Sequence, residues 1–178
     1  MNTRPIYFAL AVMLPLAAGA DYTYKVATVI KTDTLAATAA AAPPDRVSDQ
    51  PVSHVESAEG RLGIGVVHRP VIAAGGPIEA IQHHKQSEVY RVMAGSGTLV
   101  TSTRMSAAEQ IDPEGYVVTQ LTGPSDRGVI DDVAASQLIE EGDIVIIPAG
   151  VAHGFSEITS PITYMVVRVD PERLVALK

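Results

Sequence analysis

Short apolar runs rich in β-branched residues follow one another from residue 60 to residue 170, with glycine or proline between them. No long segment with the 3.6-residue periodicity of a helix interrupts this series. Strands about eight to twelve residues apart, with turn residues between them, are typical of an antiparallel sandwich or barrel. The pattern therefore predicts an all-β fold, with a polar loop at 103–115 and strands at 62–67, 78–82, 88–93, 98–102, 117–121, 129–133, 136–139, 143–147 and 162–169.

The first twenty residues have a different pattern. A short basic start ending at Arg4 precedes an almost wholly apolar run at 6–16, and Ala18 and Ala20 are small residues at the positions that a signal peptidase recognises. The apolar run is shorter than the roughly twenty residues that span a bilayer. We therefore expect 1–20 to be a signal peptide and the protein to be exported, periplasmic or secreted, with no membrane association after processing.

The segment from residue 21 to residue 59 is expected to be an N-terminal arm or linker. Residues 22–30 are compatible with a strand, and 35–42 is an alanine and threonine tract that contains a second small-x-small site for later cleavage. Ser53 and Glu56 have the spacing of a capping box, which predicts one short helix. The barrel is expected over 60–170, followed by a C-terminal tail at 171–178.

Composition narrows the chemistry. The chain has 178 residues and no cysteine, which excludes disulfides, iron–sulfur clusters, cysteine-ligated zinc and thiol nucleophiles. Its formal charge is -7 and it has no cluster of lysine and arginine, so we expect no nucleic-acid partner. Sequence motifs for dinucleotides, nucleoside triphosphates and serine hydrolases are also missing. Histidines, carboxylates, amides and hydroxyls remain as the functional groups.

Three histidines lie beside turn signals, namely the neighbours His83 and His84, and His153 after a Pro-Ala-Gly turn. On one straight strand, His84 and Glu88 would lie about 13 Å apart at about 3.3 Å per residue. The chain must therefore turn at 85–87 if both residues bind one ion. Two imidazoles and one carboxylate are a ligand set for Fe, Mn, Zn or Ni with open positions for a substrate or O₂.

Two segments in order resemble the paired motifs of the cupin family. The first is Gly76-x5-Gln82-x-His84-x3-Glu88-x6-Gly95, and the second is Gly142-Asp-Ile-Val-Ile-Ile-Pro-Ala-Gly-Val-Ala-His153. The resemblance covers roughly residues 60–170. It implies a double-stranded β-helix, or cupin jelly-roll barrel, with one divalent metal ion inside.

By the same resemblance, the metal ligands are His84, Glu88 and His153. The position two residues before His84, which holds a histidine in most cupins, is Gln82 here. Strand alternation favours Gln82 as the fourth ligand, because residues two apart share a face. Ligand chemistry favours His83, because imidazole binds these metals better than an amide does. The sequence leaves this choice open.

The expected function is that of a metal-binding cupin acting on a small organic molecule, with a carboxylate, enolate or diol favoured because the bound ion would stay positively charged. We favour an enzyme, either a dioxygenase or a lyase or isomerase, with Tyr90 and Glu157 as candidate catalytic residues. Tyr90 is also compatible with a role as core filler, since it lies two residues after Glu88 on a strand.

Two other functions compete with this one. The first is a non-catalytic periplasmic module that binds a ligand or metal, and the replaced ligand position at Gln82 favours it. The second is a metal-free, sugar-epimerase-like cupin, for which Tyr90 would be the acid. A homodimer paired through edge strands is implied by the resemblance.

Overall fold

The structure, a computed structural model, describes residues 26–176, so the predicted signal peptide lies outside the described residues. The elements in chain order are α1 (Thr32–Ala40), β1 (Ser48–Ser57), β2 (Gly60–Arg69), β3 (Glu79–His83), β4 (Ser87–Ser102), β5 (Ser106–Gln110), the π-helical turn η1 (Val117–Thr122), β6 (Ser125–Val129), β7 (Ala135–Glu140), β8 (Ile144–Ile147) and β9 (Ala152–Asp170). All strand pairs are antiparallel. No helix among residues 26–176 is long and apolar enough to cross a membrane.

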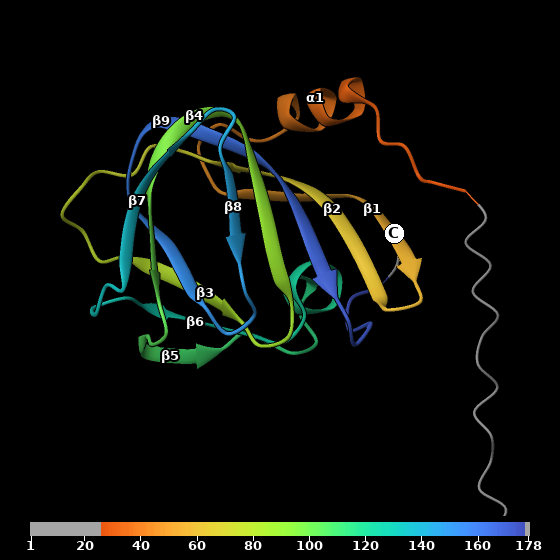
Figure 1. Ribbon diagram of the computed structural model, residues 1–178. Helices are drawn as coiled ribbons and strands as arrows, with labels where there is room; N and C mark the ends of the chain where they lie inside the picture. The colour runs from red at the N-terminus through yellow and green to blue at the C-terminus, as the bar shows by residue number, and fades with distance from the viewer. Residues whose placement is uncertain (1–25, 177–178) are drawn as a thin grey trace, which may run out of the picture.

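The strands form two layers that share β4 and β9 (Figure 1). In the first layer the order is β1, β2, the second half of β9, the first half of β4, and β8. In the second layer the order is β5, β6, β3, the first half of β9, the second half of β4, and β7. This is a jelly roll, and it confirms the predicted all-β double-stranded β-helix.

Both shared strands change layer near Gly95. The pairing of β4 with β9 is irregular between Val92 and Leu99, where the two strands bend together. Gly95 has a φ of 78°, and a Cβ added to it would lie 2.0 Å from the carbonyl oxygen of Pro161. Glycine is therefore required at this bend both for its backbone conformation and for its small size.

The core between the layers is apolar in its middle and polar at one end. Aliphatic and aromatic side chains from both shared strands form the apolar part, including Val92, Leu99, Phe155 and Ile162. The buried polar side chains include His83, Gln86, Glu88, His153 and Arg168. Burial of charged groups lowers the stability of a fold unless the groups are paired, and such groups cluster at functional sites. This polar end is therefore the candidate functional site.

One prediction for the segment before residue 60 is wrong. The helix expected at Ser53 does not form, because β1 pairs along the length of β2, with Ser53 opposite Ile64. A helix forms earlier, where alanine-rich Thr32–Ala40 has high helix propensity and ends before two prolines. This helix, α1, lies against β1 and β2 (Figure 1).

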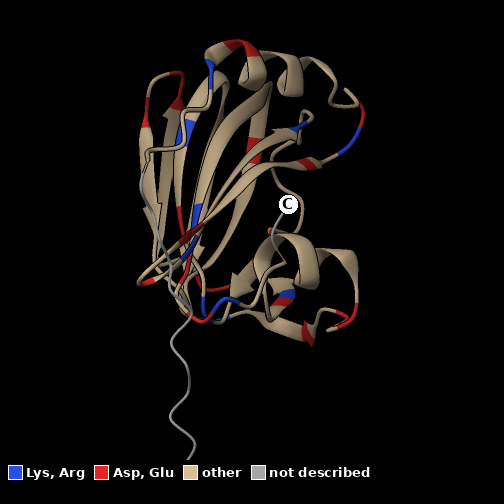
Figure 2. Cartoon of the chain, turned by 90° about the vertical axis from the view of Figure 1, so that its right-hand side faces the viewer, with Lys and Arg blue, Asp and Glu red and all other residues tan. Residues whose placement is uncertain are grey.

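Elsewhere, the expected polar loop at 103–115 contains β5, and the strand expected at 117–121 is η1. Charged positions are spread over the molecule, with acidic and basic ones interspersed on the side that Figure 2 shows.

We predict that Gly95→Ala lowers the free energy of unfolding by about 2 to 4 kcal/mol, because it adds both backbone strain and a steric clash with Pro161. Gly75→Ala is the matched control, since Gly75 has a φ of 87° but no atom within 4 Å of its added Cβ. Gly75→Ala should lower the free energy of unfolding by about 1 kcal/mol, and urea unfolding measures both variants. An equal decrease in the free energy of unfolding of the two variants would contradict the prediction that the contact with Pro161 makes Gly95→Ala more destabilising.

Candidate metal centre

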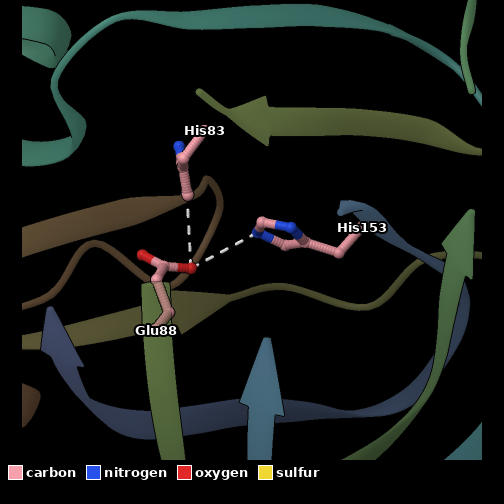
Figure 3. A group of neighbouring side chains, drawn as sticks. All are labelled: His83, Glu88 and His153. Carbon is pink, nitrogen blue, oxygen red and sulfur yellow. Dashed lines mark ion pairs between the residues drawn. The ribbon is translucent and has the colours of Figure 1, made fainter. Parts of the chain in front are cut away.

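Three side chains from three strands meet at the polar end of the core. His83 is the last residue of β3, Glu88 is the second residue of β4, and His153 is the second residue of β9. Glu88 Oε2 lies 3.4 Å from His83 Nε2 and 3.3 Å from His153 Nε2. Figure 3 shows both imidazoles directed at this one oxygen. All three side chains are buried, and their ligand atoms lie within 4.8 Å of one another.

The other nitrogen of each imidazole is held by a hydrogen-bond acceptor. His153 Nδ1 lies 3.0 Å from the carbonyl oxygen of Val151 and must donate to it. His83 Nδ1 lies 2.9 Å from Ser125 Oγ. The single hydroxyl proton of Ser125 points to the Gly123 carbonyl or to Thr122 Oγ1, so Ser125 Oγ accepts from His83. In the neutral imidazoles, both Nε2 atoms therefore present lone pairs toward Glu88.

The charges of the site are set by its neighbours. Burial lowers the pKa of the His83 imidazole, against the opposing effect of Glu88. Burial alone would raise the pKa of Glu88, but Arg168 and the two imidazoles hold the pKa well below its usual range. Arg168 Nε donates to Glu88 Oε1 at 2.7 Å. The ionised carboxylate thus favours a positive charge beside it, either a proton on an imidazole Nε2 or a cation bound between the two imidazoles and Glu88.

Two of the three ligand separations match those around a transition-metal ion. Ligand atoms about 2.1 Å from one ion are separated by about 3.0 to 3.4 Å in tetrahedral or octahedral coordination. The two separations from Glu88 Oε2 are 3.3 and 3.4 Å. His83, Glu88 and His153 are therefore the residues that would hold such an ion, in a two-histidine, one-carboxylate set.

A cavity of about 180 Å³ opens beside these three residues. Its other lining residues include the apolar Val67, Ile81 and Leu121, together with Asp49, Arg69, Tyr90, Tyr164 and Arg168. A larger cleft of about 540 Å³ shares Arg69, Ile81 and His153 with it. The shared residues place the inner cavity next to the outer cleft.

The register at the end of β3 differs by one residue from the expected one. His84, expected as a ligand, lies outside the cluster, with its Nε2 3.1 Å from Asp126 Oδ2 and a side chain 37% exposed. Gln82, one of the two candidates for the fourth ligand, is turned away as well and donates to the Gly150 carbonyl at 2.7 Å. His83 takes the inward place.

The reason is the pairing of β3 with β6, which sets His83 opposite Ser125 and Gln82 opposite Asp126. Ile81 shares the inward face with His83 and lines the cavity, so an apolar side chain stands two residues before the inward histidine. The alternation of Ile81 with polar Gln82 was the available sequence signal.

The two candidate catalytic residues lie in different places. Tyr90 is buried, lines the inner cavity and donates to Glu88 Oε2 at 2.7 Å. Burial and the nearby Glu88 raise the pKa of Tyr90 well above its ordinary value, so the phenol stays protonated. Glu157 pairs with Thr98 further along β9 and lines neither cavity.

Sequence reasoning did not single out Arg69, Arg168, Asp49 or Ser125 at this site. Arg168 holds Glu88 and is itself held by both oxygens of Asp49, at 3.2 and 2.6 Å. A sequence signal existed only for Arg168, which is a lone charge within an apolar strand. The contact of Asp49 with Arg168 depends on the pairing of distant strands.

The fold and this group of residues together define a small cupin-type jelly roll with a two-histidine, one-carboxylate site. No family model matches the sequence, and no curated protein matches it. Among solved structures, a protein of Bacillus halodurans has 13% identity and a TM-score of 0.45, covering 85% of this chain and 92% of that one.

The descriptions of two other similar structures state what kind of protein each of them is. The cupin domain of Schizosaccharomyces pombe Cnp3 has 9% identity and a TM-score of 0.41, covering 70% of this chain and 68% of that one. The DMSP lyase DddQ of Ruegeria pomeroyi has 19% identity and a TM-score of 0.40, covering 71% of this chain and 53% of that one. Likenesses at these identities concern the fold alone.

We predict a specific pH dependence for metal-free protein kept in chelator. Because the pKa of Glu88 is lower in the folded chain than its ordinary value of 4.5, its ionised form stabilises the fold above that value, and this contribution is lost as the pH falls toward the folded pKa. The free energy of unfolding of the wild type should therefore exceed that of Glu88→Gln most at pH 6, with a smaller difference below pH 4.5.

Urea unfolding at several pH values measures this difference, and Glu157→Gln, outside the cluster, is the control. A difference between wild type and Glu88→Gln that grows as the pH falls would contradict the assignment of an ionised Glu88.

Proposed function

We propose that the protein binds one divalent metal ion through His83, Glu88 and His153 and uses it to act on a small organic molecule. The observation that carries this proposal is the convergence of two imidazole Nε2 atoms on one oxygen of an ionised, buried carboxylate. When bound, the ion would polarise a substrate oxygen, or bind O₂ if it is iron. A carboxylate, enolate or diol is the substrate class that such an ion favours.

The surrounding residues of the chain would prepare the site. Arg168, fixed by Asp49, keeps Glu88 ionised, and the Tyr90 hydroxyl holds the carboxylate in one orientation. Ser125 and the Val151 carbonyl fix the tautomers of the two histidines. Val67, Ile81 and Leu121 give the cavity apolar walls that limit water beside the ion. The one hydroxyl proton of Tyr90 is used in its bond to Glu88, so Tyr90 would support a ligand of the ion and not donate to the substrate.

The metal-free epimerase alternative is less well supported. It requires a histidine base whose N–H points at a carboxylate that orients it. Here the Nδ1 protons of His83 and His153 point to Ser125 and Val151, away from Glu88. The donor arrangement therefore favours a metal site, and a non-catalytic metal-binding module remains the competing function.

The ligand set is tested by metal content. We expect His83→Ala to weaken Co²⁺ or Zn²⁺ affinity by at least 100-fold, because the ion loses one of its three protein ligands and no other side chain takes the place of the imidazole. His84→Ala is the matched control, since it removes the neighbouring imidazole from outside the cluster, and it should change affinity by less than threefold. Elemental analysis after dialysis and competition with a chelator give both values. A site emptied by His84→Ala and kept by His83→Ala would refute the assignment.

A second prediction concerns the hydrogen bond that orients His83. Ser125→Ala should lower metal affinity by about 10- to 100-fold, because the Nδ1 proton of His83 loses its acceptor and the imidazole loses its fixed tautomer. Ser136→Ala, at an exposed position of β7, should leave the affinity unchanged. The same competition assay measures both variants, and an unchanged affinity in Ser125→Ala would exclude this supporting role.

The reaction type follows from the metal that supports turnover. Protein loaded with Fe²⁺ that consumes O₂ with an added substrate favours a dioxygenase, and turnover with Zn²⁺ under anaerobic conditions favours a lyase or isomerase. Binding without turnover by either form favours the non-catalytic module.

A further inference from the structure

Arg69, the last residue of β2, lies where the inner cavity and the outer cleft meet. Its half-buried side chain lines both the inner cavity beside His83, Glu88 and His153 and the larger outer cleft. Only Ile81 and His153 share this double position. Arg69 therefore lies at the boundary between the cleft and the cavity.

The guanidinium group is fixed but only partly used. Arg69 Nε donates to the Tyr164 hydroxyl at 3.0 Å, and its central carbon lies 5.4 Å from the centre of the Phe155 ring. Within residues 26–176, neither of its terminal nitrogens has a hydrogen-bond or ion-pair partner. Arg168, in the same cavity, contrasts with this, because its nitrogens bind Glu88 and Asp49.

The charge balance of the inner cavity makes this contrast meaningful. Arg168 is shared by two carboxylates, those of Glu88 and Asp49, so these three residues together carry one negative charge. Arg69 adds one positive charge without touching either carboxylate. A bound divalent ion would then leave the cavity with a net charge of about +2, which favours an anionic ligand.

The outer cleft carries different charges. It is lined by Glu79 and by the pair of Arg127 with Glu109, whose atoms lie 3.3 Å apart. Arg127 is already paired there, so the terminal nitrogens of Arg69 are the unpaired cationic donors at the junction. Two parallel N–H groups of a guanidinium match the two oxygens of a carboxylate.

We propose that Arg69 binds the carboxylate of the substrate through its two terminal nitrogens, while the rest of the substrate extends toward His83, Glu88 and His153. This inference rests on the proposed metal-dependent function and narrows its substrate class to carboxylic acids. The inner cavity of about 180 Å³ is smaller than the roughly 300 Å³ at which pockets for drug-sized ligands begin. A short acid with a second oxygen beside the carboxylate, such as a 2-hydroxy or 2-oxo acid, fits this description.

The test uses Co²⁺-loaded full-length protein and two probes of equal size, lactate and its neutral amide, lactamide. Calorimetry and the Co²⁺ absorption spectrum report binding. We expect the wild type to bind lactate at least tenfold more tightly than lactamide. Arg69→Met should weaken lactate binding by about 10- to 100-fold, with little effect on lactamide and less than a threefold effect on Co²⁺ affinity. Arg69→Lys, which keeps the charge but not the paired donors, should recover part of the loss.

Arg127→Met is the matched control, since it removes a guanidinium from the outer cleft and should leave lactate binding unchanged. Thermal unfolding of each variant verifies that it is folded. If Arg69→Met does not fold, Arg69→Lys still tests the proposal. Lactate binding that is equal in the wild type and both Arg69 variants, or no tighter than lactamide binding in the wild type, would overturn this inference alone. Failure of the wild type to take up Co²⁺ would overturn it together with the proposed function.

Discussion

The ionised Glu88 carboxylate, enclosed in the core of a β-sandwich, is the constraint on which the site depends. A buried, unpaired charge costs several kcal/mol, and removal of one member of a buried pair leaves that cost exposed. Arg168 compensates Glu88, and Asp49 in turn compensates Arg168. The chain of contacts runs through β4, β9 and β1, and β2 lies between β9 and β1, so four strands of the first layer must pair correctly before the carboxylate is stable. The two imidazoles then come from the second layer and from the shared strand β9.

The same constraint explains why the segment before residue 60 belongs to the folded unit. Asp49 lies in β1, which the hydrophobic pattern of the sequence did not predict as a strand. Its residues are mostly polar, and their half-buried positions on an edge strand give little alternation for a pattern to detect. The pairing with β2 supplies what the local sequence lacks. Asp49 consequently reaches Arg168 although the two residues are far apart in the chain.

Other parts of the structure follow closely from local sequence. The strands that carry Glu88 and Ile162 are strongly apolar and were predicted from periodicity, and the turn before His153 was predicted from Pro148 and Gly150. The choice between His83 and His84 could not be predicted in this way. A shift of one residue exchanges the two faces of a strand, and with two adjacent histidines either register places one histidine on the inner face. The pairing of β3 with β6 decides it. The positions of Arg69 and Arg168 likewise require the tertiary fold.

The sharing of β4 and β9 between the two layers also bears on how the molecule opens. Each strand is one continuous backbone whose halves lie in different sheets, and the bend at Gly95 is locked against Pro161. Separation of the layers would therefore break the ladder of both long strands at once. Slow amide hydrogen exchange along β4 and β9 would then report a single cooperative opening of both layers, whereas the amides of α1 and of the short edge strand β5 would exchange through local fraying.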